Sequence, residues 1–208
     1  MVIGYIIGFL VAIFLLVLYL IKPNQKRIEK LPVQMFAHRG LHGKTVPENS
    51  LAAFKKAYER KLGVELDVRF TRDKKVVVFH DDTLIRLCGK DIKVYELEYD
   101  ELQNYSIAGT GEKIPLLTDV LKVLNGMPVI CEIKSNNTGP VEELCKAVCD
   151  IISDYEGFIC IESFDPFVVK WFRKNRPDII RGQLSMRFSG EKGDLSFLEA
   201  FAMTNLFV

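Results

Sequence analysis

From residue 35 onward, short apolar runs alternate with amphipathic stretches of helical period. Because strand, helix and strand in succession build a parallel sheet covered by helices, the pattern predicts an α/β protein, either a (β/α) TIM-type barrel or a doubly wound sheet. No GxGxxG or phosphate-loop signature follows the first strand, which favours the barrel. Strands are predicted at 35–37, 63–68, 75–79, 128–133, 158–162 and 179–184, and helices at 50–62, 117–125, 140–153 and 165–175.

Capping residues mark the starts of three of these helices. Asn49 or Ser50 can cap the first helix, Thr118 the second, and Asp165-Pro166 opens the last with a proline in its first turn. The stretch 81–114 interrupts the alternation, because it is polar and contains three glycines. It is predicted to form an excursion over one end of the sheet.

An uncharged, mostly apolar segment precedes the α/β part. Residues 2–21 have the ~20-residue length of a bilayer-spanning helix, longer than a signal-peptide core, and no small-residue cleavage site follows. We therefore predict a transmembrane anchor at 1–22 and a juxtamembrane linker at 23–34. Gly4 and Gly8 form a GxxxG pattern, a weak indication of self-association through the anchor.

The charges that flank this segment predict its orientation. No basic residue precedes it, whereas four follow it, namely Lys22, Lys26, Arg27 and Lys30. The positive-inside rule then places the rest of the chain in the cytoplasm. The expected location is the cell membrane, with a single span and residues 35–208 in the cytoplasm.

The barrel domain, residues 35–208, is short for its predicted fold. About 175 residues and six strands remain after the linker, whereas a complete eightfold barrel has ~250 residues and at least ~200. The last segment, 195–208, is strongly apolar and has no polar closure. It would either dock on a membrane or partner or mark a sequence that is cut short. We expect a barrel that is incomplete at its C-terminus through truncation.

Charge and cysteine content exclude some classes of partner and site. The chain has 28 basic and 27 acidic residues and no block of like charge, so nucleic acid is not an expected partner. Its five cysteines are odd in number and include no CxxC pair, which argues against a zinc site or a disulfide framework. Cys145 and Cys149 share the apolar face of a predicted helix and are expected to be buried thiols.

Three carboxylates occupy similar positions near the ends of predicted strands. Glu65 and Asp67 are two residues apart, so their side chains point to the same side of the strand. Glu132 and Lys134 are placed in the same way on a later strand. An exposed, solvated face would also fit this pattern, but in a barrel that face is the interior, where active sites form. Three carboxylates favour a hard cation, Ca²⁺ or Mg²⁺ before Zn²⁺.

Two of the three histidines stand in polar clusters at the ends of apolar runs. His38 follows Phe36-Ala37 and His80 follows Val78-Phe79. Because imidazole titrates near neutral pH, both are candidates for proton transfer beside a metal. Arg39 and Lys134 supply the positive charge that a phosphate group requires.

Taken together, these motifs resemble those of the glycerophosphodiester phosphodiesterase family. The matching stretches are HRG (38–40), PENSLAAF (47–54), ELDVRFTRD (65–73), VVFHDDTLIR (77–86), IPLL (114–117) and EIK (132–134). The resemblance covers about residues 35–184. It implies a (β/α) barrel with Glu65, Asp67 and Glu132 as metal ligands, His38 and His80 as the acid–base pair, and Arg39 and Lys134 on phosphate. The family's last two strands, one bearing a tryptophan, have no counterpart here.

The expected function is metal-dependent hydrolysis of glycerophosphodiesters to glycerol phosphate and an alcohol. Water or the neighbouring glycerol hydroxyl can serve as the nucleophile, and the residues do not choose between them. Two alternatives stay open. One is a non-catalytic, membrane-tethered module that binds phospholipid headgroups, and the other is a lysophospholipase D that acts on lysophospholipids at the membrane.

Overall fold

The computed structural model describes residues 2–20, 29, 32, 35–135 and 140–184. The chain divides into two units, of which residues 31–182 hold most of the sheet. The other unit consists of residues 1–30 and 183–208. Almost all of the predicted linker and the whole apolar segment 195–208 lie outside the described residues, and truncation stays a prediction.

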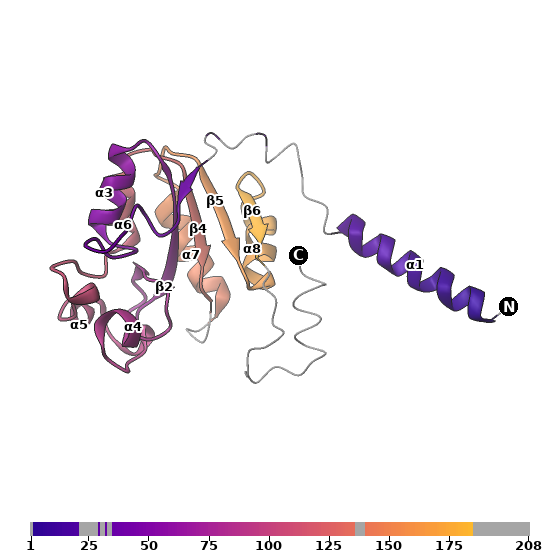
Figure 1. Cartoon of the computed structure of the whole chain (residues 1–208), viewed down its shortest axis with the longest axis horizontal. Coiled ribbons are helices and arrows are strands. Elements are labelled where there is room, and N and C mark those ends of the chain that lie inside the picture. The colour runs from indigo at the N-terminus through magenta and orange to yellow at the C-terminus, as the bar shows by residue number, and fades with distance from the viewer. Residues whose placement is uncertain (1, 21–28, 30–31, 33–34, 136–139, 185–208) are drawn as a thin grey trace. The chain divides into compact units, whose positions relative to one another are not determined.

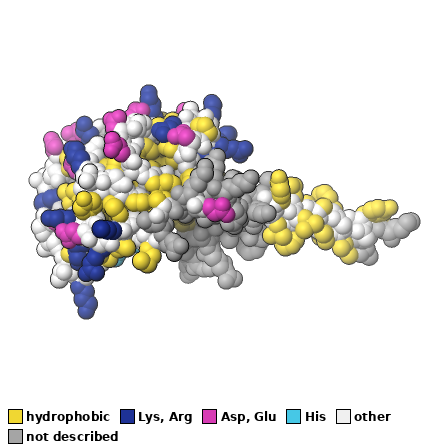
Figure 2. Space-filling view, turned by 90° about the horizontal axis from the view of Figure 1, so that it is seen from above, with side chains coloured by type: hydrophobic (Ala, Val, Ile, Leu, Met, Phe, Trp, Pro, Cys, Tyr) yellow, Lys and Arg dark blue, Asp and Glu magenta, His cyan; other side chains and the backbone are white. Residues whose placement is uncertain are grey.

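Helix α1 (Val2–Leu20) is the regular element of the smaller unit. Its described large apolar side chains, among them Tyr5 and Phe9, are exposed, and Figure 2 shows them as a run of hydrophobic side chains. Among the described residues, no helix combines the length and the apolarity that a membrane span requires. The transmembrane anchor stays a prediction.

The larger unit is built on a parallel sheet whose strands follow one another in chain order. The order is β1-β2-β4-β5-β6, and the pairs β1/β2, β2/β4 and β4/β5 are parallel. Figure 1 shows β2, β4, β5 and β6 in this order. In a doubly wound sheet the strand order reverses at a switch point within the sheet. This sheet shows no such reversal among its described strands, so it has the topology of a TIM-type barrel. The strands are β1 (Phe36–Ala37), β2 (Gly63–Phe70), β3 (Val76–Val78), β4 (Val129–Ile133), β5 (Ile159–Ser163) and β6 (Ile180–Gln183).

Strand β3 does not belong to the parallel row. It pairs antiparallel with the end of β2, with Val78 opposite Val68 and Val76 opposite Phe70. The connection is a tight turn in which the Thr71 backbone N–H donates to the Lys75 carbonyl. A parallel neighbour would need a crossover of a dozen residues or more. The prediction of six barrel-type strands was therefore wrong for β3, and the other five described strands lie along the path β1-β2-β4-β5-β6.

Four helices follow the strands of the sheet: α3 (Leu51–Glu59), α6 (Leu117–Leu124), α7 (Val141–Ile152) and α8 (Pro166–Asn175). Ser50 caps α3 through its hydroxyl, and Asp165 caps α8 through its carboxylate, as predicted. The prediction for Thr118 was wrong, because α6 begins after Leu116 and Thr118 lies inside its first turn. Buried apolar residues of these helices form one core with the sheet, which includes Cys145, whereas Cys149 is only half-buried.

The excursion at 81–114 has a small core of its own. It contains α4 (Ile85–Cys88), η1 (Val94–Glu96), α5 (Tyr99–Leu102) and η2 (Ile107–Gly109). Alternate residues of β3 point to opposite sides, so Val76 and Val78 join the main core while Val77 joins the second. The other buried members of the second core are Phe79, Leu84, Val94, Leu102, Ile107 and Ile114. The segment is thus a packed subdomain, which fixes the start of the loop that bears His80.

Candidate active site

The three predicted carboxylates meet on one side of the sheet. Asp67 of β2 stands opposite Glu132 of β4 in the parallel register, and Glu65 lies two residues before Asp67 on the same side. Oxygen atoms of all three lie within 4.8 Å of one another. The exposed fractions of the residues are 7% for Glu65, 0% for Asp67 and 7% for Glu132. A solvated outer face is thereby excluded, and the carboxylates point to the buried side that a barrel would enclose.

Lys134 supplies the positive charge nearest to this cluster. Its Nζ lies 3.1 Å from Asp67 Oδ1 and 2.5 Å from Glu132 Oε1. Burial alone would raise the pKa of Asp67, but Lys134 and a hydrogen bond from Asn49 outweigh it and hold that pKa below its ordinary value. For Glu132, burial outweighs the contact with Lys134, and the pKa is raised. One lysine therefore does not neutralise all three carboxylates.

Glu65 is the carboxyl group of the cluster whose ionised form is disfavoured. Burial, followed by the neighbouring Asp67 carboxylate, raises the pKa of Glu65 to about 8. The Arg39 backbone N–H donates to Glu65 Oε2 at 2.9 Å, and His38 Nε2 lies 3.8 Å from the same oxygen. Without a cation, this carboxyl group is therefore protonated over much of the neutral range.

A strained turn after β1 presents His38 and Arg39. Arg39 has a φ of +55° and Gly40 a φ of +77°, both in the left-handed region. A Cβ atom on Gly40 would lie 2.9 Å from Ala53 Cβ, so only glycine lets the turn pack on α3. The Arg39 guanidinium donates to Glu48 Oε1 at 2.8 Å, and its Nε lies 3.4 Å from Asp67 Oδ2. His38 remains largely exposed, with 67% of its side chain accessible.

His80 follows β3 and is held from two sides. Arg69, buried on β2, donates to the His80 carbonyl through Nε at 2.9 Å and Nη2 at 2.7 Å. The His80 Nδ1 atom lies 2.7 Å from Asp81 Oδ1. Burial lowers the pKa of His80, and Asp81 only partly opposes it. Burial, followed by the Arg39 charge, also lowers the pKa of His38.

Two residues of the loop before α3 belong to the site although sequence reasoning assigned them no role in it. Asn49 Nδ2 donates to Asp67 Oδ2 at 2.9 Å, while its Oδ1 is buried without a hydrogen-bond partner. Asn49 also has a φ of +52°, a conformation often found at functional sites. Glu48 accepts hydrogen bonds from Arg39 and Arg86. The sequence predicts Asn49 only as a possible cap of the first helix.

A fourth carboxylate, Glu162, stands next to the cluster. It lies opposite Glu132 in the register of β4 and β5, one residue before the end of its strand. Burial, followed by the charges of Glu132 and Asp67, raises its pKa to about 7. The signal was present in the sequence, because Ile159-Cys160-Ile161-Glu162 repeats the apolar-run-then-carboxylate pattern that identified Glu132.

The donor set fits a hard divalent cation. All three converging side chains offer carboxylate oxygens, the ligands that Ca²⁺ and Mg²⁺ prefer. Asp67 Oδ1 is buried and has an ion pair with Lys134 but no hydrogen bond, so it keeps lone pairs for a metal. A divalent charge would also relieve the repulsion from Asp67 that, after burial, contributes to the raised pKa of Glu65.

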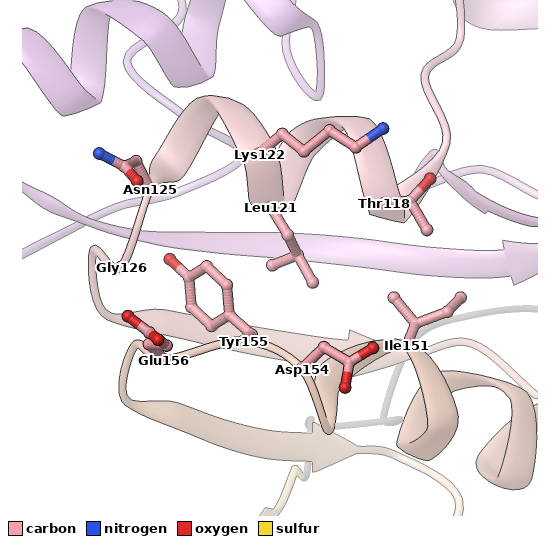
Figure 3. A pocket seen from close by; sticks show the side chains of 9 residues that line it. All are labelled: Thr118, Leu121, Lys122, Asn125, Gly126, Ile151, Asp154, Tyr155 and Glu156. Atoms are coloured by element: carbon pink, nitrogen blue, oxygen red, sulfur yellow. The ribbon is translucent and has the colours of Figure 1, made fainter.

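A separate hollow of about 420 Å³ has a lining that includes none of these residues. Figure 3 shows the side chains that line it. Its lining comes from α6, the turn before β4, the end of α7 and the turn before β5, so it lies near the amino ends of strands. Active sites of TIM-type barrels form at the opposite, carboxyl end. The lining residues are Thr118, Leu121, Lys122, Asn125, Gly126, Ile151, Asp154, Tyr155 and Glu156.

Parallel strands in chain order, with buried carboxylates and two histidines toward their carboxyl ends, define a protein of the TIM-type barrel class. The parallel pairing of β2 with β4 ends at Val68, one residue after Asp67, which places the cluster at that end. The chain belongs to the glycerophosphodiester phosphodiesterase family. Its residues 38–194 match the family model described as "Glycerophosphoryl diester phosphodiesterase family".

Curated relatives agree with this assignment. The chain is 32% identical over 163 residues to the human protein "Lysophospholipase D GDPD1", covering 71% of this chain and 50% of that protein. It is 34% identical over 163 residues to "Glycerophosphodiester phosphodiesterase" of Caldanaerobacter subterraneus subsp. tengcongensis, covering 72% and 65%. The chain thus spans about half the length of the human relative and about two thirds of the bacterial one.

Solved structures show the same fold. A phosphodiesterase of Oleispira antarctica in complex with the product sn-glycerol-3-phosphate superimposes with a TM-score of 0.68 at 30% identity. That match covers 76% of this chain and 68% of the other. A glycerophosphodiester phosphodiesterase of Thermotoga maritima gives a TM-score of 0.61 at 31% identity and covers 82% and 67%. The match to these barrels bears out the parallel-sheet α/β fold.

Proposed function

We propose that this chain hydrolyses glycerophosphodiesters to glycerol phosphate and an alcohol with the help of Ca²⁺ or Mg²⁺. The observation that carries the proposal is the convergence of Glu65, Asp67 and Glu132, which are buried and have oxygens within 4.8 Å of one another. Among the described residues, these carboxylates have Lys134 and Arg39 beside them, and Arg39 also pairs with Glu48, so a further cation would relieve their repulsion. The relative named as a glycerophosphodiester phosphodiesterase and the neighbour that holds glycerol phosphate support the choice of substrate.

The three carboxylates would hold the cation, which when bound supplies positive charge to the phosphoryl oxygens. Lys134 donates one of its three N–H groups to Glu132 and forms an ion pair with Asp67, so it keeps N–H donors for a phosphate oxygen. Arg39 has donors beyond the one that Glu48 accepts. These two cations would therefore position the phosphate between the acidic cluster and the turn after β1.

The two histidines would carry the protons. One removes a proton from the nucleophile while the other protonates the departing alkoxide oxygen. Burial lowers the pKa of both groups, so an uncharged imidazole that can act as a base is present at neutral pH. His80 exchanges its proton through Nε2, because Asp81 occupies the Nδ1 side. Water as nucleophile gives glycerol phosphate directly, and the glycerol hydroxyl gives a cyclic phosphate first, which ³¹P NMR distinguishes.

Substitution of the histidines tests these acid–base roles. His38→Ala and His80→Ala should each remove turnover of glycerophosphocholine while leaving the Ca²⁺ affinity within a few-fold of the unchanged chain. His42→Ala is the matched control, since His42 lies in an exposed loop. Full activity in either of the first two variants would contradict the acid–base proposal. Binding of the substrate by the unchanged chain without any product would favour the headgroup-binding module.

A lysophospholipase D activity is the second candidate, and the human relative of that name supports it. Comparing glycerophosphocholine with lysophosphatidylcholine separates the two. Faster turnover of the lysolipid favours the lysophospholipase D. Faster turnover of the water-soluble diester favours the first proposal.

We also propose, on sequence grounds alone, that residues 2–21 attach the chain to the cell membrane with residues 35–208 in the cytoplasm. The absence of charge in this segment and the four basic residues that follow it support the proposal. Weak self-association through the GxxxG pattern is part of it. Recovery of the chain in the membrane fraction, and its loss from that fraction on deletion of residues 2–21, would be the expected result.

A further inference from the structure

A chain of charged contacts joins the turn after β1 to His80. Glu48 accepts from Arg39 Nη1 at 2.8 Å and from Arg86 Nη1 and Nη2 at 3.0 and 2.7 Å. Arg86 donates in turn to Asp81 through Nε at 2.6 Å and Nη2 at 3.1 Å. Asp81 completes the path with its contact of 2.7 Å to His80 Nδ1.

The path differs from an ordinary surface ion pair, which contributes little. The side chains of Arg39 and Glu48 are only 16% and 14% exposed. The contact between Glu48 and Arg86 joins residues 38 positions apart in the chain, so it connects two separate loops. Arg86 binds both partners through two nitrogens each, and such paired contacts fix the orientation of a planar guanidinium.

Asp81, at the end of this path, determines which nitrogen of the neutral His80 ring carries the proton. An ionised carboxylate only accepts hydrogen bonds, so Asp81 requires a proton on Nδ1. The Arg86 charge keeps Asp81 ionised, and the pKa of this carboxyl is low although burial alone would raise it. A neutral His80 then carries its free electron pair on Nε2. This is the arrangement in which a carboxylate orients a catalytic imidazole.

We infer that Glu48 and Asp81, bridged by Arg86, are positioning residues that hold His80 in one tautomer and one orientation relative to Arg39. The inference rests on the proposed function, because it assigns His80 the proton transfer. The same ionic connection fixes the turn after β1 and the loop that bears His80 relative to each other. Neither Glu48 nor Asp81 needs to touch the substrate for this effect.

The test uses Asp81→Asn and Glu48→Gln in the full chain, assayed with glycerophosphocholine and Ca²⁺. Both changes keep size and remove charge. Asp81→Asn should lower kcat by about 10- to 100-fold, part of the ~10²–10⁴-fold that general acid–base catalysis contributes, with little change in KM. Glu48→Gln should lower kcat by a smaller factor. Glu101→Gln is the control, since it removes one carboxylate from an exposed ion pair with Arg72 and should leave kcat unchanged.

A spectroscopic measurement separates failure of this inference from failure of the proposed function. In ¹⁵N NMR of the histidine rings, assigned with His80→Ala, the unchanged chain should show His80 with its proton on Nδ1. Asp81→Asn should give a mixture of tautomers, because an amide can either accept or donate. An inactive chain with this spectrum would contradict the function and uphold the positioning. A proton on Nε2 in the unchanged chain, or kcat unaltered in an active Asp81→Asn variant, would overturn the inference.

Discussion

Asn49 Nδ2 donates a hydrogen bond to Asp67 Oδ2 at 2.9 Å, which ties the loop before α3 to the most buried carboxylate of the acidic cluster. Asn49→Gly should weaken Ca²⁺ binding by about 10-fold or more, as expected for a residue that orients a metal ligand. Glycine tolerates the left-handed backbone at this position, so the change isolates the side chain. Isothermal titration calorimetry gives the affinity.

A matched control separates this effect from backbone flexibility. Asn125 has a φ of +43° at the end of α6, in a turn that precedes β4. Asn125→Gly should leave the Ca²⁺ affinity unchanged. An equal loss in both variants would contradict the role given to the Asn49 amide.

The raised pKa of Glu65 predicts how the stability of the metal-free protein depends on pH. The ordinary pKa of a glutamate is 4.5, whereas that of Glu65 in the folded chain is about 8. At pH values between these two, the folded chain binds a proton at Glu65 that the unfolded chain has released. The free energy of unfolding should therefore fall as pH rises through this range. Urea unfolding of EDTA-treated protein at pH 5, 6.5 and 8 measures the trend. Glu65→Gln should flatten it, and a steeper fall in that variant would count against the assignment.

The same titration predicts a pH-dependent metal affinity. Because the cation must displace the proton of Glu65, Ca²⁺ should bind more tightly as pH rises toward about 8. Calorimetry in two buffers of different ionisation enthalpy should detect proton release on binding. An affinity that does not change between pH 6 and 8 would show that Glu65 is not a ligand.

Lys134 should matter more to the metal-free protein than to the metal-bound one. Lys134→Met leaves Asp67 and Glu132 without their paired cation and should lower the free energy of unfolding by about 3 kcal/mol in EDTA. Added Ca²⁺ should recover part of the loss, since it replaces the missing charge. Lys122→Met, on an exposed side chain paired with Asp119, should change stability by less than about 0.5 kcal/mol. Equal effects of the two changes would refute the prediction.

Replacement of Gly40 by a larger residue should lower the free energy of unfolding for a steric reason as well as through its backbone angle. Gly40→Ala would place a Cβ atom 2.9 Å from Ala53 Cβ, and it would strain a residue with a φ of +77°. Gly89→Ala is the control, because Gly89 has a φ of +67° but nothing within 4 Å of its Cβ position. Strain alone costs about 1–2 kcal/mol. Chemical unfolding should show a larger loss for Gly40→Ala, and equal losses would exclude the close approach to α3.

Sequence periodicity predicted the strands and helices of the sheet well, because apolar runs and caps are local signals. Residues 63–68 and 128–133 alternate with amphipathic helices, and β2 and β4 lie there. The direction of β3 could not be read in the same way. Its run, Val76–Val78, looks like any other buried strand, and only the short connection after Phe70 indicates that it turns back.

The candidate site was predictable where residues repeat the strand periodicity. Glu65, Asp67 and Glu132 follow that pattern, and the structure brings them together. Asn49 was missed because its contact with Asp67 spans 18 positions and has no periodic signature. Glu162 was missed despite such a signature. The positions of His38 and His80 near strand ends were predictable, but the connection between their loops depends on side-chain geometry that no local pattern contains.

The most direct test is release of glycerol phosphate from glycerophosphocholine by the EDTA-treated chain during titration with Ca²⁺ or Mg²⁺. If the acidic cluster holds the catalytic cation, we expect no product without metal, saturable activity with it, and loss of at least about 100-fold in Glu132→Gln at the same metal concentration. Product formation in EDTA at the rate seen with metal, or an unaltered rate in Glu132→Gln, would contradict it.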